Sequence, residues 1–569
     1  MMLYRHTNKV FYGFCIALLG LIVCTSSCME QASSEVLFNK TVRDSSAQAY
    51  FKTELTKITS NNTLVDALNN KSAEAIKKDF KTFYELSKDK LVWQNIVSRG
   101  PSKQITNFIE ILTKEAPTNG LSVNNYQLKK IEDLYHSLYV PNLPESIDHL
   151  EKMVELEFLL TTAALAYSAD LLNGAITHSS RWEVPKRPEK TFAESLIKAI
   201  RYGGVDKHYA NLTPKYKGYA LMQAQMERYL KAAKKGGLPK INGTLSKGKK
   251  GDKVKNLIDY LVAVNDLPAD KANTDTYNED VVNAVKKYQK RHYIPISGAV
   301  DNATVKALNI PVEERIEKLA LNLERYRWLP DPETLGERYV WANIPEFILK
   351  VYEEQEKVAE IVVVVGDLKN ATPVMVGKKM QNIIFSPTWT LPQSIAQEEM
   401  EFILKNPAVL VVADVDVWID GKKVNPMEVD WKNIGKKKVK MRQRPKNTNS
   451  MGKAKFQFAN NHGIYLHDTP NQLDFTKRSR AYSHGCLRVK EPKQLAVTLL
   501  KGSNWNKNNI TSAMASNKEQ YAKLPKETNV HIYYMTAWVD DDGEVQFRND
   551  VYGYDKRQLK ALAPYMPKV

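Results

Sequence analysis

Cysteine is almost absent from this 569-residue chain, which has four cysteines, three of them within the first 28 residues. Structural disulfides require pairs of cysteines. The sequence beyond residue 28 therefore excludes a disulfide-stabilised framework. It leaves Cys486 as a single thiol, which is either reactive or buried and inert.

The N-terminal apolar run, Val10 to Val23, is short for a membrane-spanning helix, which needs roughly 20 residues. Arg5 and Lys9 flank it on the N-terminal side, and small residues follow it up to Cys28. Residues 1–28 therefore predict an export signal, with an uncleaved membrane anchor as the alternative. The small residues directly before Cys28 resemble a bacterial lipoprotein signal, in which Cys28 becomes the lipid-modified N-terminus.

Export also bears on Cys486, because exported proteins normally hold their cysteines in disulfides. A single thiol that stays unpaired in an oxidising compartment favours a chemical role for that thiol.

Acidic residues are in deficit: 82 Lys and Arg stand against 64 Asp and Glu, which gives a formal net charge of +18. Such an excess favours an acidic partner, such as nucleic acid, an anionic membrane or a carboxylate-rich polymer. Charge does not choose among these partners, and a merely soluble basic protein is the alternative. The length predicts three or four domains, each with enough apolar residues for a core.

Residues 33–235 predict a helical scaffold domain, because strand-like runs are few there. Leu150 to Asn173 is nearly apolar through its middle and predicts a buried central helix that Gly174 ends. No catalytic constellation occurs in this region, so we assign it only a scaffold or docking role.

A linker rich in Lys and Gly, Lys234 to Lys253, precedes a predicted three-helix module at residues 245–311. Apolar residues recur with helical spacing after Val254 and again after Val281. Asp301 is placed to cap a third, short helix. A generic helical spacer is the alternative for this module.

Residues 312–332 predict a connecting helix, and residues 337–555 predict a mainly β catalytic domain with a few helices. Within it, residues 398–438 fit either a lid over the site or a peripheral excursion without a gating role. The fold class is therefore multidomain α+β, with an N-terminal helical scaffold, a three-helix module and a C-terminal mainly β domain. Strands are predicted at residues 339–344, 347–352, 358–366, 383–385, 439–442, 464–467, 530–538 and 545–547, and helices at residues 394–405 and 491–500.

The stretch Asn461 to Lys490 carries the chemistry, because it holds Cys486 and three of the ten histidines. Cys486 follows Ser483-His484-Gly485, and His467 lies nineteen residues upstream. These are the parts of a Cys/His nucleophile pair.

Alternation along a strand would place Tyr465 and His467 on one face and Ile464 and Leu466 in the core. His467 then faces an open cleft, and Asp468 points away from it. We therefore expect a backbone carbonyl, not an aspartate, to orient the imidazole.

Cys486 needs a base, donors for an oxyanion, and room for a substrate. An imidazole near neutral pKa makes His467 the candidate base. Gly485 brings no side chain, so the amides of Gly485 and Cys486 are placed to face an oxyanion. Ser483 and His484 are expected around the thiol, and Arg488 is expected to bind a substrate carboxylate.

A zinc site is the competing interpretation, because His462, His467, His484 and Cys486 supply nitrogen and sulfur ligands. His462 and His467 are five residues apart on a predicted strand and so face opposite ways. At most three ligands converge, and we therefore predict no metal and no cofactor.

His467, followed after fifteen residues by Ser483-His484-Gly485-Cys486 and then by Arg488, resembles the signature of the L,D-transpeptidase (YkuD-type) catalytic domain. The segments FSPTWTLPQSI, RQRPKNTNSMGKAKFQF and GIYLHDTP resemble the longer members, which carry a helical scaffold domain and a peptidoglycan-binding module. Residues 245–311 likewise resemble the small peptidoglycan-binding module of bacterial cell-wall enzymes.

The resemblance implies that Cys486 attacks the carbonyl of the third residue of a peptidoglycan tetrapeptide stem and expels the terminal D-alanine. The acyl group then passes to an amine of a second stem. By position, His467 is the base, Gly485 and Cys486 supply the oxyanion amides, and Ser483 and Arg488 shape the site.

Further candidates for substrate binding are Tyr465, His484, Arg442, Arg480 and Trp389. Either arginine could hold a stem-peptide carboxylate, with a solvated arginine as the alternative. Trp389 is expected to line the donor groove, with a core tryptophan as the alternative.

The leading hypothesis is an envelope L,D-transpeptidase that makes 3→3 cross-links, held in the periplasm by a lipid on Cys28. Carbapenem-type β-lactams are expected to acylate Cys486, and no nucleic-acid partner is expected. The alternatives are an L,D-carboxypeptidase or related cysteine hydrolase, and a non-catalytic peptidoglycan-binding lipoprotein.

Overall fold

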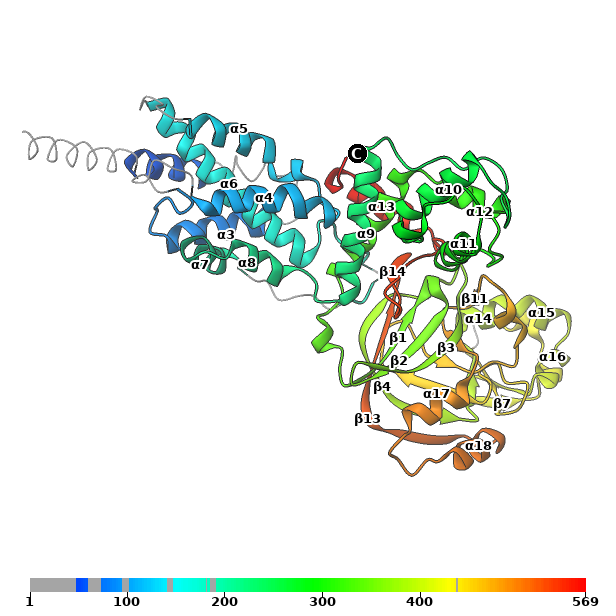
Figure 1. Cartoon of the computed structure of the whole chain (residues 1–569). Helices are drawn as coiled ribbons and strands as arrows, with labels where there is room; N and C mark the ends of the chain where they lie inside the picture. Colours follow the sequence, from blue (N-terminus) through cyan, green and yellow to red (C-terminus); the bar gives the residue numbers. More distant parts are fainter. Residues whose placement is uncertain are drawn as a thin grey trace, which may run out of the picture. The chain divides into compact units, whose positions relative to one another are not determined.

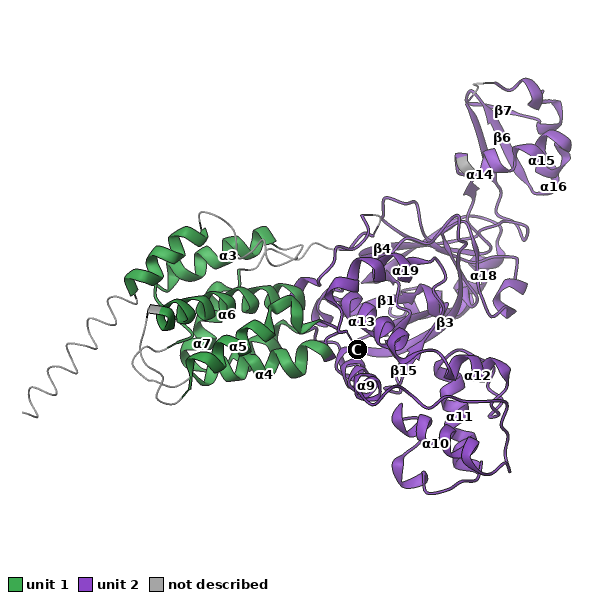
Figure 2. Ribbon diagram, turned by 90° about the horizontal axis from the view of Figure 1, so that it is seen from above, with its two compact units in different colours: residues 1–117, 122–171, 189–213 green, residues 118–121, 172–188, 214–569 purple. Residues whose placement is uncertain are grey.

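The computed structural model describes residues 48–59, 73–94, 102–140, 147–180, 182–184, 191–435 and 438–568. Contacts divide the chain into two compact units (Figure 2). Unit 1 comprises residues 1–117, 122–171 and 189–213, and unit 2 the remainder. The predicted signal at residues 1–28, with Cys28, lies outside the described residues. Of the helices within the described ranges, none is long and apolar enough to cross a bilayer.

Unit 1 is helical, as its polar segments with apolar periodicity predict (Figure 1). Its central helix α6 (Ile147–Asn173) is buried along most of its length, which confirms the prediction for residues 150–173. Gly174 follows it with φ +77°, a left-handed conformation that ends a helix at little cost for glycine. Further helical segments of this unit include residues 48–59, α3 (Ala73–Leu86), α4 (Lys103–Thr118), α5 (Leu128–Leu138), α7 (Ala193–Tyr202) and α8 (Val205–Leu212).

The long continuous part of unit 2, residues 214–569, begins with helix α9 (Lys217–Lys234) and the three-helix module, α10 (Asp252–Ala263), α11 (Glu279–Arg291) and α12 (Asn302–Leu308). The predicted cap is confirmed, because Asp301 Oδ1 accepts a hydrogen bond from the Thr304 amide at 2.7 Å. Inside the module Arg291 and Asp266 form a fully buried, bidentate ion pair. The connecting helix α13 spans Val312–Arg327.

The catalytic domain is built on a nine-stranded sheet with the order β11-β3-β12-β10-β9-β4-β13-β1-β2. Strand β2 also pairs with β3, so the sheet closes on itself. The core face carries fully buried apolar residues such as Phe456, Leu466 and Leu487. The strands are β1 (Arg338–Asn343), β2 (Ile348–Glu353), β3 (Glu356–Gly366), β4 (Met375–Phe385), β9 (Ala454–Phe458), β10 (Leu466–His467), β11 (Ala481–Ser483), β12 (Leu487–Val489) and β13 (Gln520–Tyr533).

Two predicted strands differ from the observed ones because side chains replace backbone partners. The strand predicted at residues 464–467 begins only at Leu466, since the Asn460 side chain bonds both the amide and the carbonyl of Ile464. The strand predicted at residues 530–538 is two strands, β13 and β14 (Ala537–Val539). The chain leaves the large sheet after Tyr533, and the Thr536 amide then donates to Asn322 while its hydroxyl donates to Asp555. Strand β14 pairs instead with β15 (Val545–Phe547).

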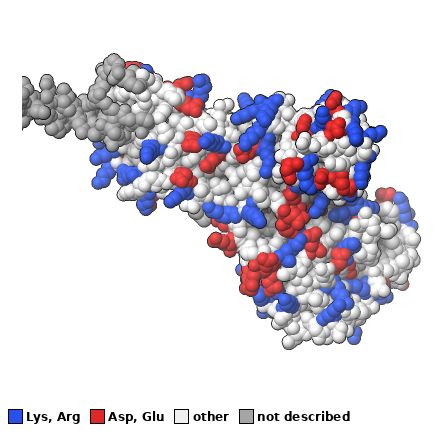
Figure 3. Space-filling view, in the orientation of Figure 1, with Lys and Arg blue, Asp and Glu red and all other residues white. Residues whose placement is uncertain are grey.

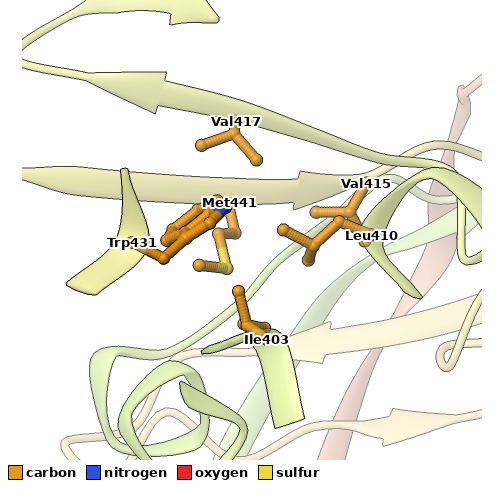
Figure 4. Packing of buried hydrophobic residues seen from close by; sticks show 6 residues of the cluster. All are labelled: Ile403, Leu410, Val415, Val417, Trp431 and Met441. Atoms are coloured by element: carbon orange, nitrogen blue, oxygen red, sulfur yellow. The ribbon is translucent and has the colours of Figure 1, made fainter. Parts of the chain in front are cut away.

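The insertion predicted at residues 398–438 folds around its own small core. A second sheet, with order β5-β8-β6-β7, packs its apolar face on short helices. The helix predicted at residues 394–405 is broken at Glu399 into α14 (Gln393–Glu398) and α15 (Met400–Lys405). The strands are β5 (Trp389–Thr390), β6 (Val415–Ile419), β7 (Lys422–Val424) and β8 (Val439–Gln443), and helix α16 spans Ala408–Val412. The core residues in Figure 4 are Ile403, Leu410, Val415, Val417, Trp431 and Met441.

Three helices complete the domain: α17 (Pro492–Leu499), α18 (Lys507–Ala515) and α19 (Tyr554–Leu562). Over the face in Figure 3, basic and acidic side chains are interspersed, so the net positive charge is spread and not gathered in one block. The charge pattern on that face therefore does not by itself select a binding groove.

Candidate active site

The strand register brings the predicted catalytic residues to one face of the large sheet. In the parallel pair β10–β12, His467 lies opposite Arg488, and in the antiparallel pair β10–β9 it lies opposite Lys455. Residues opposite each other in neighbouring strands point to the same face. Lys455, His467 and Arg488 therefore form a row. Cys486, two residues before Arg488, approaches the same face at the level of Tyr465.

The His467 ring is oriented by a backbone carbonyl, as expected. Its Nδ1 lies 2.5 Å from the carbonyl oxygen of Asp468. A carbonyl can only accept, so Nδ1 carries the hydrogen and Nε2 is left as a proton acceptor. The Asp468 carboxylate is used elsewhere, on the amides of Lys453 and Thr469 at 2.7 Å each. The site is therefore a Cys/His pair without an aspartate.

His467 is buried, with 4% exposure, where the sequence predicts an open cleft. Burial lowers the pKa of His467 to about 3, because the imidazolium loses its hydration there. The Asp468 carbonyl opposes this shift, and the cations of Arg488 and Lys455 add to it. The ring is therefore neutral near pH 7.

Cys486 is partly buried, and burial raises the pKa of its thiol. Hydrogen bonds from the Tyr465 amide and side chain oppose the shift, as do the charges of Lys455 and Arg488. The resting site thus holds a neutral thiol and a neutral imidazole. A nucleophilic role for Cys486 would require its thiol to lose a proton.

The loop that carries Cys486 is fixed by its own hydrogen bonds. Ser483 Oγ donates to the Cys486 carbonyl at 2.5 Å and accepts from the Gly485 amide at 3.2 Å. Thr372, which the sequence did not single out, donates to the Gly485 carbonyl at 2.8 Å. The amide of Gly485 is thus already engaged. The Cys486 amide has no hydrogen-bond partner among the described residues and is open to an oxyanion.

Gly485 occupies a position where a side chain would be strained. Its φ is +103°, and a Cβ atom would lie 3.2 Å from Ile464 Cδ1. Glycine is therefore required by the turn that presents Cys486.

The predicted arginines have different surroundings. Arg488 donates to Asp474 at 3.0 Å, and Asp474 also pairs with Lys477. Arg480 directs its donors to the backbone carbonyls of residues 347, 363 and 477, so it braces the framework and does not reach the row described above. Arg442 Nη2 donates to Thr388 Oγ1 at 2.6 Å.

Two predicted residues lie at the junction with the insertion. Trp389 starts strand β5 and is half-buried beside β8. His484 turns outward, with Nε2 2.8 Å from Glu398 Oε2 of helix α14, and does not surround the thiol. His484 therefore joins the nucleophile loop to the insertion.

The residues proposed as zinc ligands are dispersed. His462 Nε2 lies 3.0 Å from Glu183 Oε1, and His484 pairs with Glu398. Within the ranges that the structure describes, no group of three or more His, Cys, Asp or Glu could hold a metal ion.

Sequence alternation could have found one residue that the prediction missed. In the strand AKFQF, Ala454, Phe456 and Phe458 are buried, so Lys455 must point to the opposite face, toward His467. Thr372 and Asp474 carry no such signal, because they lie in irregular segments.

Comparison with known proteins assigns three regions. Residues 337–510 match the family model of the L,D-transpeptidase catalytic domain (YkuD), residues 78–226 that of the Scaffold domain, and residues 250–308 that of a "Putative peptidoglycan binding domain". A Haemophilus influenzae protein named "Putative L,D-transpeptidase" is 32% identical over 243 residues. That match covers 42% of this chain and 48% of the relative, so the chain spans about half of the relative's length.

Among solved structures, an L,D-transpeptidase from Xylanimonas cellulosilytica is 15% identical, with a TM-score of 0.17. That match covers 51% of this chain and 98% of that one. One from Stackebrandtia nassauensis is 15% identical with a TM-score of 0.19, over 52% and 96%. These scores are too low to carry an argument. The family matches show that this chain carries an L,D-transpeptidase (YkuD-type) catalytic domain, a scaffold domain and a peptidoglycan-binding domain.

Proposed function

We propose that this protein is a peptidoglycan L,D-transpeptidase that forms 3→3 cross-links through a thioester on Cys486. The observation that carries the proposal is the tautomer of His467. Because Nδ1 is held by the Asp468 carbonyl, Nε2 is a proton acceptor on the face that Cys486 shares. This is the arrangement that a thiol nucleophile needs.

In the first half-reaction, His467 Nε2 takes the proton of the Cys486 thiol. The sulfur attacks the carbonyl carbon of the third stem residue, and the Cys486 amide donates to the resulting oxyanion. Collapse of this intermediate breaks the bond to the terminal D-alanine. The imidazolium returns its proton to the departing amine, which leaves an acyl-enzyme and a neutral imidazole.

In the second half-reaction, the side-chain amine of another stem attacks the thioester. His467 takes a proton from that amine and gives it to the departing sulfur of Cys486. The products are the cross-linked peptide and the free thiol. Water as the acceptor would instead give a tripeptide, which is the hydrolase outcome.

The remaining regions fit a wall substrate. A peptidoglycan-binding domain on the same chain would hold the enzyme on its polymer, and the formal net charge of +18 suits a carboxylate-rich wall. The proposed location is the periplasmic side of a bacterial envelope, with the chain attached through a lipid on Cys28.

Inhibition by carbapenem-type β-lactams follows from the same chemistry. The strained lactam carbonyl offers Cys486 an acyl donor whose leaving amine stays tethered. We propose a stable adduct of one inhibitor per chain at Cys486, detectable as a mass increase in the intact protein.

The test is incubation of the purified full chain with disaccharide-tetrapeptides, followed by mass spectrometry. Cross-linked dimers that have lost one alanine are the expected product, and Cys486→Ala is expected to form none. If tripeptides are the only product, the enzyme catalyses hydrolysis and not transfer, which would refute the transpeptidase proposal. Unchanged substrate, with the protein still sedimenting with peptidoglycan, would leave only a binding role and refute the proposal.

A further inference from the structure

Lys455 is a basic residue of the active-site face that no part of the proposed mechanism has used. It lies on β9, directly opposite His467 in the register. Its neighbours Ala454 and Phe456 are fully buried in the core, so the lysine side chain extends over the catalytic face.

The position of its ammonium group is defined by an aromatic ring. Lys455 Nζ lies 4.0 Å from the centroid of the Tyr465 ring, a cation–π contact. Tyr465 is the residue whose amide and side chain hydrogen-bond the Cys486 sulfur. The ring therefore holds the lysine charge beside the nucleophile.

No carboxylate forms an ion pair with Lys455 in the part of the chain that the structure describes. Arg488, the other cation of the row, differs because it is paired with Asp474 at 3.0 Å. Glu519 is the acid whose charge reaches Lys455, but its carboxylate accepts hydrogen bonds from Thr388 and Tyr521. The charge of Lys455 is thus the least neutralised in the site.

The catalytic pair needs such a charge. Burial raises the pKa of the Cys486 thiol and lowers the pKa of His467, so both changes oppose formation of a thiolate and an imidazolium. Lys455 acts on the thiol in the opposite direction, and Cys486 reciprocally raises the pKa of Lys455 against the effect of burial. An unpaired cation near sulfur favours the thiolate.

We infer that Lys455 is a further residue of the proposed reaction: its ammonium group stabilises the negative charge on the Cys486 sulfur while the proton passes to His467 Nε2. The inference rests on Cys486 being the nucleophile. The S–H bond breaks, its proton goes to the imidazole, and Lys455 keeps all of its own protons. The charges that act on the sulfur are those of Lys455 on β9 and Arg488 on β12, and Glu519, ahead of β13, acts on Lys455.

The experiment measures thiol reactivity without any substrate. Iodoacetamide alkylates only the thiolate, so below the thiol pKa the rate follows the thiolate fraction. The rate at Cys486 is followed by intact mass between pH 7 and 9 in the full chain. Lys455→Met is expected to lower the rate by about tenfold, which corresponds to about one unit of thiol pKa. Lys455→Arg keeps the positive charge and is expected to alkylate at close to the wild-type rate.

Lys453→Met is the matched control, because the Lys453 side chain is two residues away and bonds Asn517 at the exposed surface. It is expected to leave the rate unchanged. The inference is overturned if Lys455→Met, with a native circular dichroism spectrum, alkylates as fast as the wild type, or if Lys453→Met slows alkylation equally. If Lys455 merely bound a stem carboxylate, Lys455→Met would raise KM and leave both kcat and the alkylation rate unchanged.

The two proposals fail separately. If the wild type forms no product from tetrapeptides while Lys455→Met still slows alkylation, the transpeptidase proposal fails and the electrostatic role stands. If dimers form while Lys455→Met alkylates at the wild-type rate, the transpeptidase proposal stands and the electrostatic role of Lys455 fails.

Discussion

The active-site face and the contact between the peptidoglycan-binding module and β15 each bury a histidine among cations. Burial lowers the pKa of His467 to about 3 and that of His292 well below its ordinary value. The His292 ring stacks on Phe547, with centroids 4.7 Å apart and planes 2° apart, and lies 4.0 Å from the Tyr288 ring.

The two regions differ in the groups that surround the nitrogens of each histidine ring. His467 has Nδ1 satisfied by a carbonyl and shares its sheet face with a thiol. His292 Nε2 is buried without a hydrogen-bond partner among the described residues. A depressed pKa therefore reports burial in both places, and only at His467 does the proposed function assign the ring a chemical role, with Cys486.

The sharpest test of this comparison removes each imidazole. His467→Gln is expected to lower kcat for cross-linking by about 10²- to 10⁴-fold, because the thiol loses its base. His292→Leu is expected to keep kcat within about threefold, since packing alone is changed. Steady-state kinetics on folded protein measure both. A large loss of kcat in His292→Leu would mean that the module contact supports catalysis.

The next largest difference is expected in the free energy of unfolding that is lost when the ion pair of each region is broken. Asp266→Ala leaves Arg291 charged and fully buried, and is expected to cost about 3–5 kcal/mol of unfolding free energy. Asp474→Ala leaves Arg488, whose side chain is 21% exposed, able to recover water, and is expected to cost about 1 kcal/mol. Urea unfolding of the full chain measures both. Equal costs would contradict the difference in burial.

Acid should destabilise both regions in the same direction. Each histidine is neutral when folded, while its unfolded counterpart binds a proton below about pH 6.5, so stability falls as pH drops from about 6.5. For His467 the loss continues toward about pH 3, its folded pKa. Each histidine contributes a slope of about 1.4 kcal/mol per pH unit.

Replacement of His292 by Phe should remove one such slope, measured as the urea midpoint between pH 7 and pH 5. An unchanged pH dependence in His292→Phe would show that this ring is not held neutral.

The smallest effect is expected at the surface contact between the nucleophile loop and the insertion. His484→Ala breaks an exposed pair with Glu398 and should change unfolding free energy by less than about 1 kcal/mol. Turnover should change little if the insertion is peripheral. A tenfold loss of kcat at unchanged stability, repeated in Glu398→Gln, would instead indicate that the insertion gates the site.

The sequence predicted correctly those features of the fold that depend on interactions between residues close together in the chain. The apolar run before Gly174, the Asp301 cap and the alternation around His467 are each fixed by neighbours a few residues away. The carbonyl that orients the His467 ring was predicted on the same basis, whereas the pairing of His467 with Cys486 stays a prediction. The turn at Thr536 was missed, because the distant Asn322 side chain takes over the backbone partner there. The break at Glu399 was missed as well.

The sequence by itself determined the parts of the proposed site, which are one thiol presented after a glycine and one histidine upstream of it. The closed sheet decided which other residues stand beside them. Lys455 meets His467 because β9 and β12 flank β10, and Arg480 is drawn to framework carbonyls by its place ahead of β11. Strand order and register depend on pairing between distant segments, whose loop-closure cost and core packing are properties of the whole fold.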